Sequence, residues 1–350
     1  MTIPLREIEL NRFRNYRRKR FEFLSDTVIL YGPNGSGKTN LLEAIYYTSL
    51  LRSFRGHIRS RELCSWDAAD FEIKLTLDTG KYKEKLCIHE TRSGRSSWKI
   101  GESKVRCASD FINEFRAVSF VPEDRNIISN SSGYRRRFFD ILISALDREY
   151  LQALICYNRA LLQRNAAFKN MRNAVKLFEP ELSEQIPVIV SKRREYAEKT
   201  VLLFNKLSND RYHFSIDYEP DYPEDSESFL SHMETIRNRE MDRGCTLTGP
   251  HRDEFTFKFL DRDLRIYGST GQVGISALLL KMSEFLLIRE GVSLPVVALV
   301  DDVTGELDGE NLGIFFETLK LADQRFYTFS REGVIPDLFF GAQRIDLSRG

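Results

Sequence analysis

The chain has 350 residues, of which 42% are hydrophobic and 29% charged, and this is ordinary for one large globular domain or two lobes. Its formal net charge is only +1, so no overall basic excess indicates a nucleic-acid partner. Apolar runs stay well short of the roughly 18 residues of a membrane span, and the five scattered cysteines form no disulfide or zinc pattern. We therefore expect a cytoplasmic protein with no membrane span.

Charge is unevenly distributed along the chain. Residues 1–65 hold twelve Lys or Arg against six Asp or Glu, whereas residues 215–263 hold six against thirteen. A nucleic-acid-binding face is one explanation, and solvated faces whose charges happen to cluster are an equally good one.

The first informative motif follows two short predicted strands within residues 3–23. An apolar run, Val28–Tyr31, predicts a further strand and leads into Gly32–Thr39. That segment fits the P-loop pattern of Gly, four residues and Gly-Lys-Thr, and apolar residues at helical spacing follow it. Strand, glycine-rich loop and helix are the context that this motif requires.

We expect the P-loop to bind the phosphates of ATP. Glycines without a Cβ let backbone N–H groups surround a polyphosphate at a helix N-terminus. Lys38 is expected to reach the β- and γ-phosphates, and the Thr39 hydroxyl to bind Mg²⁺. The expected nucleotide-binding residues of this loop are Gly32, Pro33, Asn34, Gly35, Ser36, Gly37, Lys38 and Thr39.

Periodicity changes twice in the middle of the chain. Residues 71–105 alternate with period two and predict an antiparallel meander, whereas the period of 132–243 is helical. Strands are predicted again at Phe255–Phe259 and Leu264–Tyr267. We expect an α/β fold in three stretches: residues 1–131 and 246–350 form an ATPase lobe, and residues 132–245 form an inserted, mostly helical lobe.

A second half of the nucleotide site is expected near the C-terminus. Leu294–Val300 predicts a buried strand that ends in Asp301 and Asp302. Because buried parallel strands deliver their last residues to the phosphate crevice, Asp301 would hold Mg²⁺ and Asp302 would polarise the attacking water. Without the P-loop, this acidic pair would read as a helix N-cap.

The arrangement of these motifs resembles the heads of ABC-type ATPases. The P-loop and the acidic strand are separated by a meander and a helical lobe, and Ser269-Thr-Gly-Gln272 resembles the ABC signature motif. Within this class the chain resembles the RecF recombination-mediator family along essentially its whole length. The matching segments are Arg12–Tyr16, Gly32–Ile45, Ser53–Arg55, Phe120–Asp124, Arg135–Asp140, Tyr157–Asn165, Gly249–Asp253, Ser269–Gln272 and Asp301–Asp308.

This resemblance implies an ATPase that binds double-stranded DNA and gapped or single-strand-containing DNA. It further implies ATP-dependent dimerisation, slow DNA-stimulated hydrolysis, RecR and RecO as partners, and a role in recombinational repair, replication and the SOS response. Ser269, Gly271 and Gln272 would contact the nucleotide of the opposite subunit. Asp308 would lie in a loop that crosses the dimer, and Glu123 in a loop where other ABC proteins have glutamine. The catalytic set would then be Lys38, Asp302 and Ser269.

Two features depart from the family pattern. Val273 and Gly274 follow the signature motif, and a glycine at a helix start costs about 1 kcal/mol relative to alanine. A switch histidine is missing near Phe326–Ser330, where Thr328 or Ser330 is the best substitute. His251 and Arg252 either support the site or belong to an ordinary loop.

Other functions remain open on the sequence alone. A DNA-binding scaffold that uses nucleotide only as a conformational ligand is one, and the ATPase subunit of a transporter is another. Candidate DNA contacts are chosen for local positive charge, and they are Arg14, Arg17, Arg18, Arg55, Arg59, Arg135, Arg136 and Arg137.

Overall fold

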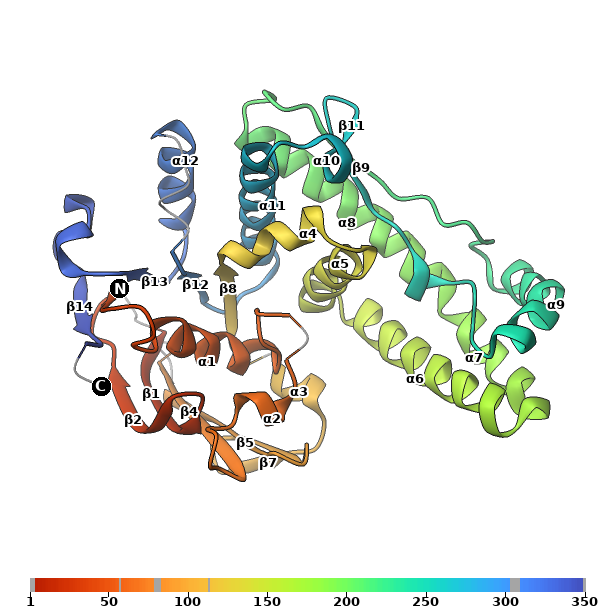
Figure 1. Cartoon of the computed structure of the whole chain (residues 1–350), viewed down its shortest axis with the longest axis horizontal. Helices are drawn as coiled ribbons and strands as arrows, with labels where there is room; N and C mark the ends of the chain where they lie inside the picture. Colours follow the sequence, from red (N-terminus) through yellow and green to blue (C-terminus); the bar gives the residue numbers. More distant parts are fainter. Residues whose placement is uncertain (1–3, 57, 79–82, 113, 303–308, 349–350) are drawn as a thin grey trace. The chain divides into compact units, whose positions relative to one another are not determined.

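The computed structural model describes residues 4–56, 58–78, 83–112, 114–302 and 309–348, and Figure 1 shows its elements. The chain divides into two units. Unit 1 combines Met1–Asp124 with Arg289–Gly350, and unit 2 is Arg125–Ile288. An insertion between two halves of one lobe is thus present, as the sequence predicts.

The boundaries differ from the predicted ones, which lie at 131 and 245. The second differs most, because the residues after 245 pack into unit 2. Strand β10 (Thr256–Phe259) pairs with β9 (Phe214–Asp217), and Asp253 forms an ion pair with Arg193. Unit 2 therefore extends to Ile288.

Unit 1 contains a five-stranded parallel sheet. Its order is β14 (Gln343–Asp346), β3 (Thr27–Tyr31), β13 (Gln324–Phe329), β12 (Val296–Val300) and β8 (Arg116–Phe120). All residues of β12 are buried, as expected for a central parallel strand. This confirms the strand predicted before Asp301. It also places the carboxyl ends of β3, β13 and β12 at one edge.

The predicted antiparallel meander is also present in unit 1, as a six-stranded sheet. Its order is β2 (Tyr16–Glu22), β1 (Leu5–Phe13), β4 (Asp70–Asp78), β5 (Lys83–Thr91), β6 (Ser96–Ile100) and β7 (Ser103–Val105). Along β4, buried residues alternate with partly exposed ones, which is the period-two pattern of a sheet with one face on the core.

Helix α1 (Lys38–Leu50) lies between the two sheets of unit 1 (Figure 1). Every residue from Leu41 to Ser49 is buried, as expected for a helix covered on all sides. One hydrophobic cluster joins this helix to residues of both sheets. The remaining helices of unit 1 are α2 (Ser60–Leu63), α3 (Ala108–Ile112) and α12 (Gly309–Leu319).

Unit 2 is mostly helical, as predicted. Its helices are α4 (Arg125–Ser129), α5 (Ser132–Leu146), α6 (Arg148–Asn170), α7 (Glu179–Glu184), α8 (Ile186–Leu207), α9 (Ser226–Arg243), α10 (Leu264–Tyr267) and α11 (Thr270–Gly291). Helices α6 and α8 run side by side (Figure 1). A small antiparallel sheet of β9, β10 and β11 (Arg262–Asp263) completes the unit.

The strand predicted at Leu264–Tyr267 is wrong, because these residues form the helical turn α10. The side chain of Asp263 accepts a hydrogen bond from the backbone N–H of Arg265 at 2.8 Å. Such a cap satisfies a free amide of the first turn and starts a helix.

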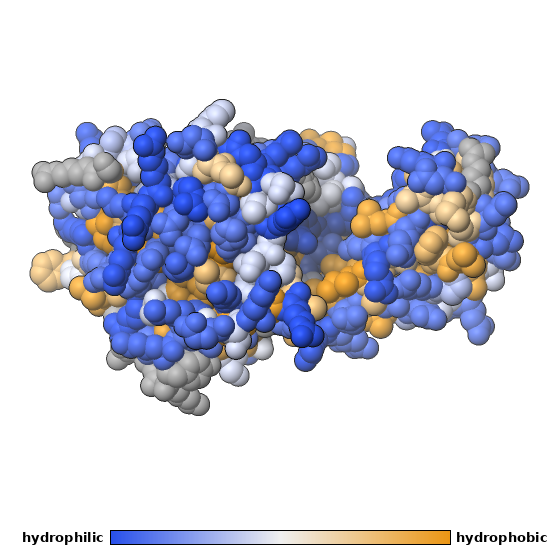
Figure 2. Space-filling view, turned by 90° about the horizontal axis from the view of Figure 1, so that it is seen from below, coloured by the Kyte–Doolittle hydropathy of each residue, from blue (hydrophilic) through white to orange (hydrophobic). Residues whose placement is uncertain are grey.

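Helix α11 is long and apolar enough to cross a membrane, by length and composition alone, although no such segment is expected from the sequence. Within this helix, 61% of the most apolar 18-residue window is buried inside the protein, which is the behaviour of a core helix. Hydrophilic side chains cover most of the face that Figure 2 shows.

Unit 2 is built around buried arginines with carboxylate partners. Arg193 is 1% exposed and donates to Asp253 at 2.6 Å and to Asp140 at 2.7 Å. Tyr218 and Tyr222 each donate a hydroxyl hydrogen bond to Asp253, at 2.6 and 2.7 Å. The segment Gly249–Asp253, singled out in the sequence, is thus anchored in the interior of unit 2.

His251 belongs to the same segment and is held in its neutral form. Its Nε2 lies 3.2 Å from the carbonyl oxygen of Thr246, and its Nδ1 lies 2.7 Å from the Tyr157 hydroxyl. Since a carbonyl only accepts, Nε2 carries the proton and Nδ1 accepts from Tyr157. Burial lowers the pKa of His251 to about 4, so the ring is neutral near pH 7.

This lowered pKa predicts a pH-dependent stability. Between pH 6.5 and 4 the unfolded chain takes up a proton at His251 that the folded chain does not, so the stability from this residue falls as the pH falls. The difference in unfolding free energy between wild type and His251→Asn should shrink by up to about 3 kcal/mol over that range. Urea unfolding at several pH values measures it, with exposed His213→Asn as control. A difference that stays constant from pH 7 to pH 4 contradicts the expectation.

Candidate nucleotide-binding site

The P-loop connects β3 to α1, as predicted. Gly37 precedes the helix with a φ of 103°, a left-handed conformation that favours glycine. A Cβ at this position would lie 2.6 Å from the Tyr16 hydroxyl oxygen. That hydroxyl donates to the Gly37 carbonyl at 3.1 Å, so the turn between β1 and β2 packs directly on the P-loop.

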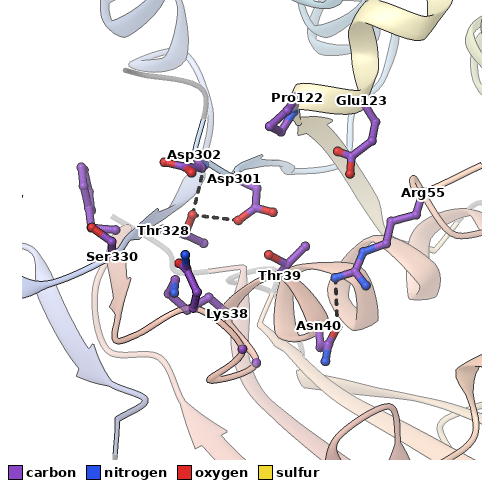
Figure 3. A pocket seen from close by; sticks show the side chains of 14 residues that line it. Lys38, Thr39, Asn40, Arg55, Pro122, Glu123, Asp301, Asp302, Thr328 and Ser330 are labelled. Carbon is purple, nitrogen blue, oxygen red and sulfur yellow. Dashed lines mark hydrogen bonds between the residues drawn. The ribbon is translucent and has the colours of Figure 1, made fainter. Parts of the chain in front are cut away.

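A cavity of about 530 Å³ opens at this edge of the parallel sheet (Figure 3). All of its lining residues belong to unit 1. They are Asn34, Gly35, Gly37, Lys38, Thr39, Asn40, Arg55, Pro122, Glu123, Asp301, Asp302, Thr328, Phe329 and Ser330. The predicted P-loop and acidic residues, about 260 positions apart in the chain, therefore share one cavity.

Lys38 points across the loop that carries it. Its ammonium donates to the carbonyl oxygens of Gly32 at 2.7 Å and Pro33 at 3.0 Å. Burial lowers the pKa of Lys38, and the carboxylates of Asp301 and Asp302 oppose this shift. The lysine is thus a positive charge fixed inside the cavity, as phosphate binding requires.

Thr328 links the acidic residues to the neighbouring strand (Figure 3). Its hydroxyl donates to Asp301 Oδ1 at 2.8 Å and accepts from the backbone N–H of Asp302 at 3.1 Å. Because β13 lies between β3 and β12, its last residues fall between the P-loop and Asp301. Thr328, one of the two substitutes considered for the missing histidine, therefore positions Asp301.

The residues present fit a nucleoside triphosphate with Mg²⁺. The ammonium of Lys38 lines the cavity together with the backbone of Gly35 and Gly37, and a fixed cation beside a glycine-rich loop suits phosphate oxygens. Mg²⁺ is commonly held by one or two carboxylates together with substrate phosphates rather than by an all-protein cage. Thr39 and Asp301 supply that kind of oxygen donor set, and the described residues contain no cluster of three or more His, Cys, Asp or Glu that could hold a metal.

Glu43 ties the cavity wall to the turn between β1 and β2. Its side chain is fully buried and accepts from Arg14 Nε at 2.9 Å, from Arg14 Nη2 at 2.7 Å and from the Ser53 hydroxyl. Arg55 Nη1 lies 3.7 Å from the same carboxylate, and Arg55 Nη2 donates to Asn40 at 2.9 Å. Arg14 and Arg55, both predicted to contact DNA, are thus partly buried beside the nucleotide cavity.

The remaining residues predicted for the nucleotide site lie in three different parts of the chain. Glu123 lines the cavity. Ser269, Gly271 and Gln272 lie in unit 2, at the start of α11. Asp308 lies outside the described residues.

The signature segment forms a regular helix start. The backbone N–H of Ser269 donates to Gln272 Oε1 at 2.9 Å, and the N–H of Gln272 lies 3.3 Å from the Ser269 hydroxyl. This reciprocal pair is a capping box. A Cβ on Gly274 would lie 3.0 Å from the Arg125 guanidinium. The glycine, which departs from the family pattern at this position, therefore leaves room for the Arg125 side chain.

The other predicted DNA contacts separate into two groups. Arg17, Arg18 and Arg59 are exposed. The prediction that Arg135 contacts DNA is wrong, because this residue is only 2% exposed. Its guanidinium donates to Glu254 and to the carbonyl oxygens of Ile128 and Asn130.

Arg136 and Arg137, the next two residues in the chain, also make contacts within the protein. Arg136 donates to the carbonyl oxygen of Asp253 at 2.6 Å, and Arg137 is only partly exposed and makes contacts of its own. Arg135 lies three, four and seven positions before the buried Phe138, Phe139 and Leu142, so helical spacing could have placed it on the core face.

Comparison with known proteins points to one family. The profile of the family described as RecF/RecN/SMC N-terminal domain matches residues 4–334. The DNA replication and repair protein RecF of Agathobacter rectalis is 31% identical over 325 residues, covering 90% of this chain and 89% of that protein. RecF of Clostridium acetobutylicum is 32% identical over 315 residues, covering 87% and 86%.

A solved structure of the recombination mediator protein RecF-ATP in the RecFOR pathway has the same fold. Its TM-score is 0.88 at 28% sequence identity, covering 96% of this chain and 94% of that one. A second, of RecF-ATPrS in the same pathway, has a TM-score of 0.86 at 28% identity and covers 99% and 98%. The similarity thus spans the whole chain, the inserted lobe included.

Proposed function

The chain belongs to the RecF family of DNA replication and repair proteins, and on that premise we propose that it is an ATP-dependent DNA-binding protein of recombinational repair. It acts in the cytoplasm in gap repair, in replication and in the SOS response. Its substrates are double-stranded DNA and DNA with gaps or single strands. RecR and RecO homologues are its protein partners.

One observation carries this proposal: a single cavity joins Lys38 and Thr39 to Asp301 and Asp302. Lys38 would pair with the β- and γ-phosphates of ATP, and Thr39 and Asp301 would hold Mg²⁺, which would supply positive charge against the phosphates. The P-loop backbone from Gly32 to Gly37 surrounds the phosphates, and Glu123 lies at the rim.

ATP closes a homodimer in this proposal. Ser269, Gly271 and Gln272 lie at the start of a helix that is exposed up to Gly271, and a helix N-terminus favours an anion. They contact the nucleotide of a second copy, and Asp308 lies at the same seam. ATP on each subunit thereby brings two basic surfaces, each with Arg17, Arg18 and Arg59, onto one DNA.

Hydrolysis is slow and stimulated by DNA. Asp302 orients the attacking water, while Lys38 and the second copy's signature serine stabilise the charge that develops on the phosphate. A scaffold that binds ATP without turnover is the second candidate. It is favoured by Thr328, whose hydroxyl is already committed to Asp301 and to the Asp302 backbone.

Substitution of the two aspartates separates these candidates. Asp302→Asn should retain ATP affinity and lower single-turnover hydrolysis on DNA by about a hundredfold. Asp301→Asn should weaken ATP binding only when Mg²⁺ is present. Nucleotide titration and phosphate release measure the two effects, and Asp110→Asn, at an exposed residue of α3 in the same unit, is the control. No phosphate release by the wild type on DNA would establish the scaffold instead.

A further inference from the structure

A second cavity of unit 1 lies beside the nucleotide cavity and is not part of it. Its volume is about 610 Å³, within the range of small-molecule sites. Asn40 and Arg55 line both cavities, so this hydrogen-bonded pair forms a shared wall. The other residues used below are Arg14, Arg61, Trp66 and Arg92.

The lining of this second cavity is strongly basic. Four arginines and one glutamate are its charged groups among the described residues. Arg14 and Arg55 share the buried Glu43, whereas Arg61 is 58% exposed and its Nε lies 3.9 Å from Oε1 of Glu62, which is itself 44% exposed. A concave surface of this charge attracts phosphate groups.

Trp66 adds an aromatic surface to the same cavity. Its side chain is 97% exposed, an unusual state for so large an apolar residue. The backbone that carries it is nevertheless held in place. Arg92 Nη2 donates to the carbonyl oxygens of Ser65 at 2.8 Å and Trp66 at 3.0 Å. The Ser65 hydroxyl donates to the Arg14 carbonyl at 2.8 Å, so the ring is presented from a fixed loop.

From this combination we infer that the second cavity binds one or more unpaired nucleotides of a DNA strand. The base stacks on the indole of Trp66, and the flanking phosphates pair with Arg61 and Arg92. Aromatic platforms within basic grooves are the common means of binding single strands without sequence preference. Bases inside a duplex are covered on both faces by their neighbours, so only unpaired bases can stack in this way.

This inference rests on the proposed DNA-binding function and extends it to a site for unpaired bases. It is tested by fluorescence, because the chain has only two tryptophans, Trp66 and Trp98. In the full-length Trp98→Phe variant, a thymidine oligonucleotide should change the emission of Trp66. Thymidine monophosphate at the same nucleotide concentration, and a blunt duplex, should not.

Affinity measurements provide a second readout in the otherwise unchanged chain. Trp66→Ala should weaken oligonucleotide binding by about tenfold, and Trp66→Phe should retain most of the affinity. Arg61→Gln should also weaken binding and reduce its salt dependence. Phe340→Ala removes an aromatic ring that is 96% exposed and does not line this cavity, and it should change nothing.

The outcomes separate this inference from the proposed function. If the duplex binds in a salt-dependent manner but the oligonucleotide leaves Trp66 emission and Trp66→Ala affinity unchanged, the inference is overturned and the proposed function stands. If monophosphate or duplex changes the emission equally well, the cavity does not select unpaired strands and the inference fails. If the wild type binds no DNA, both fail.

Discussion

Replacing Lys38 with methionine is expected to weaken ATP binding by at least about thirtyfold, since a charged hydrogen bond contributes about 2 kcal/mol, and to abolish ATP-dependent dimerisation. The ammonium lies inside the cavity, within hydrogen-bond distance of two P-loop carbonyls. Methionine keeps an unbranched stem that reaches as far as the lysine Cε, and it lacks the ammonium group. Titration with a fluorescent ATP analogue and sedimentation velocity measure the two effects.

Lys99→Met is the matched control, because Lys99 is an exposed lysine of β6 in the same unit. It should leave both ATP binding and sedimentation unchanged. Dimerisation of Lys38→Met on ATP, at wild-type nucleotide concentration, would show that the P-loop does not drive assembly.

Replacing Arg193 with methionine is expected to destabilise unit 2 by about 3–5 kcal/mol. The substitution leaves the carboxylate of Asp253 buried at 1% side-chain exposure without its cation, while Asp140 loses a bond of 2.7 Å. Adding Asp253→Asn to this variant removes the unpaired charge and should restore part of the loss, because the two residues are coupled.

The readout can distinguish the two units. Both tryptophans lie in unit 1, and most of the helices lie in unit 2. Urea unfolding of Arg193→Met should shift the circular-dichroism transition more than the tryptophan fluorescence transition. Arg194→Met removes an exposed ion pair with Glu224 and should cost less than about 1 kcal/mol. Equal effects of the two substitutions would contradict a special role for the buried network.

The parts of the fold that could be predicted are those encoded locally. The P-loop is recognised because its glycines, lysine and threonine stand between a strand and a helix. The acidic strand is recognised because a continuous apolar run ends in Asp301 and Asp302. The meander is visible because buried residues alternate along strands such as β4.

The rest of the site depends on which strands become neighbours. Thr328 contacts Asp301 only because β13 pairs with both β3 and β12. Arg55 is held at the cavity wall by Asn40 and by the buried carboxylate of Glu43. No sequence pattern marks Glu43 as buried, since glutamate is usually exposed. Trp66 reads as an ordinary loop residue until the arginines around it are placed.

The end of the inserted lobe, predicted at residue 245, also depends on contacts between residues far apart in the chain. The helical period weakens there, yet Asp253 pairs with Arg193 some sixty residues earlier in the chain. Composition could not show this pairing. The basic run at Arg135 predicts an exposed DNA contact, because local positive charge is typical of a surface. The spacing of Arg135 to Phe138 and Phe139 instead places it on the buried face of α5.

The central claim is that ATP assembles a dimer that binds DNA, and the most direct test combines sedimentation with DNA binding by the purified protein. Both are measured with and without ATP, and DNA binding is measured across a range of salt concentrations. We expect a dimer only with ATP, and a DNA affinity that rises with ATP and falls steeply with salt, by about one unit of slope for each phosphate contact. A protein that stays monomeric with ATP, or dimerises without affinity for DNA, would contradict it.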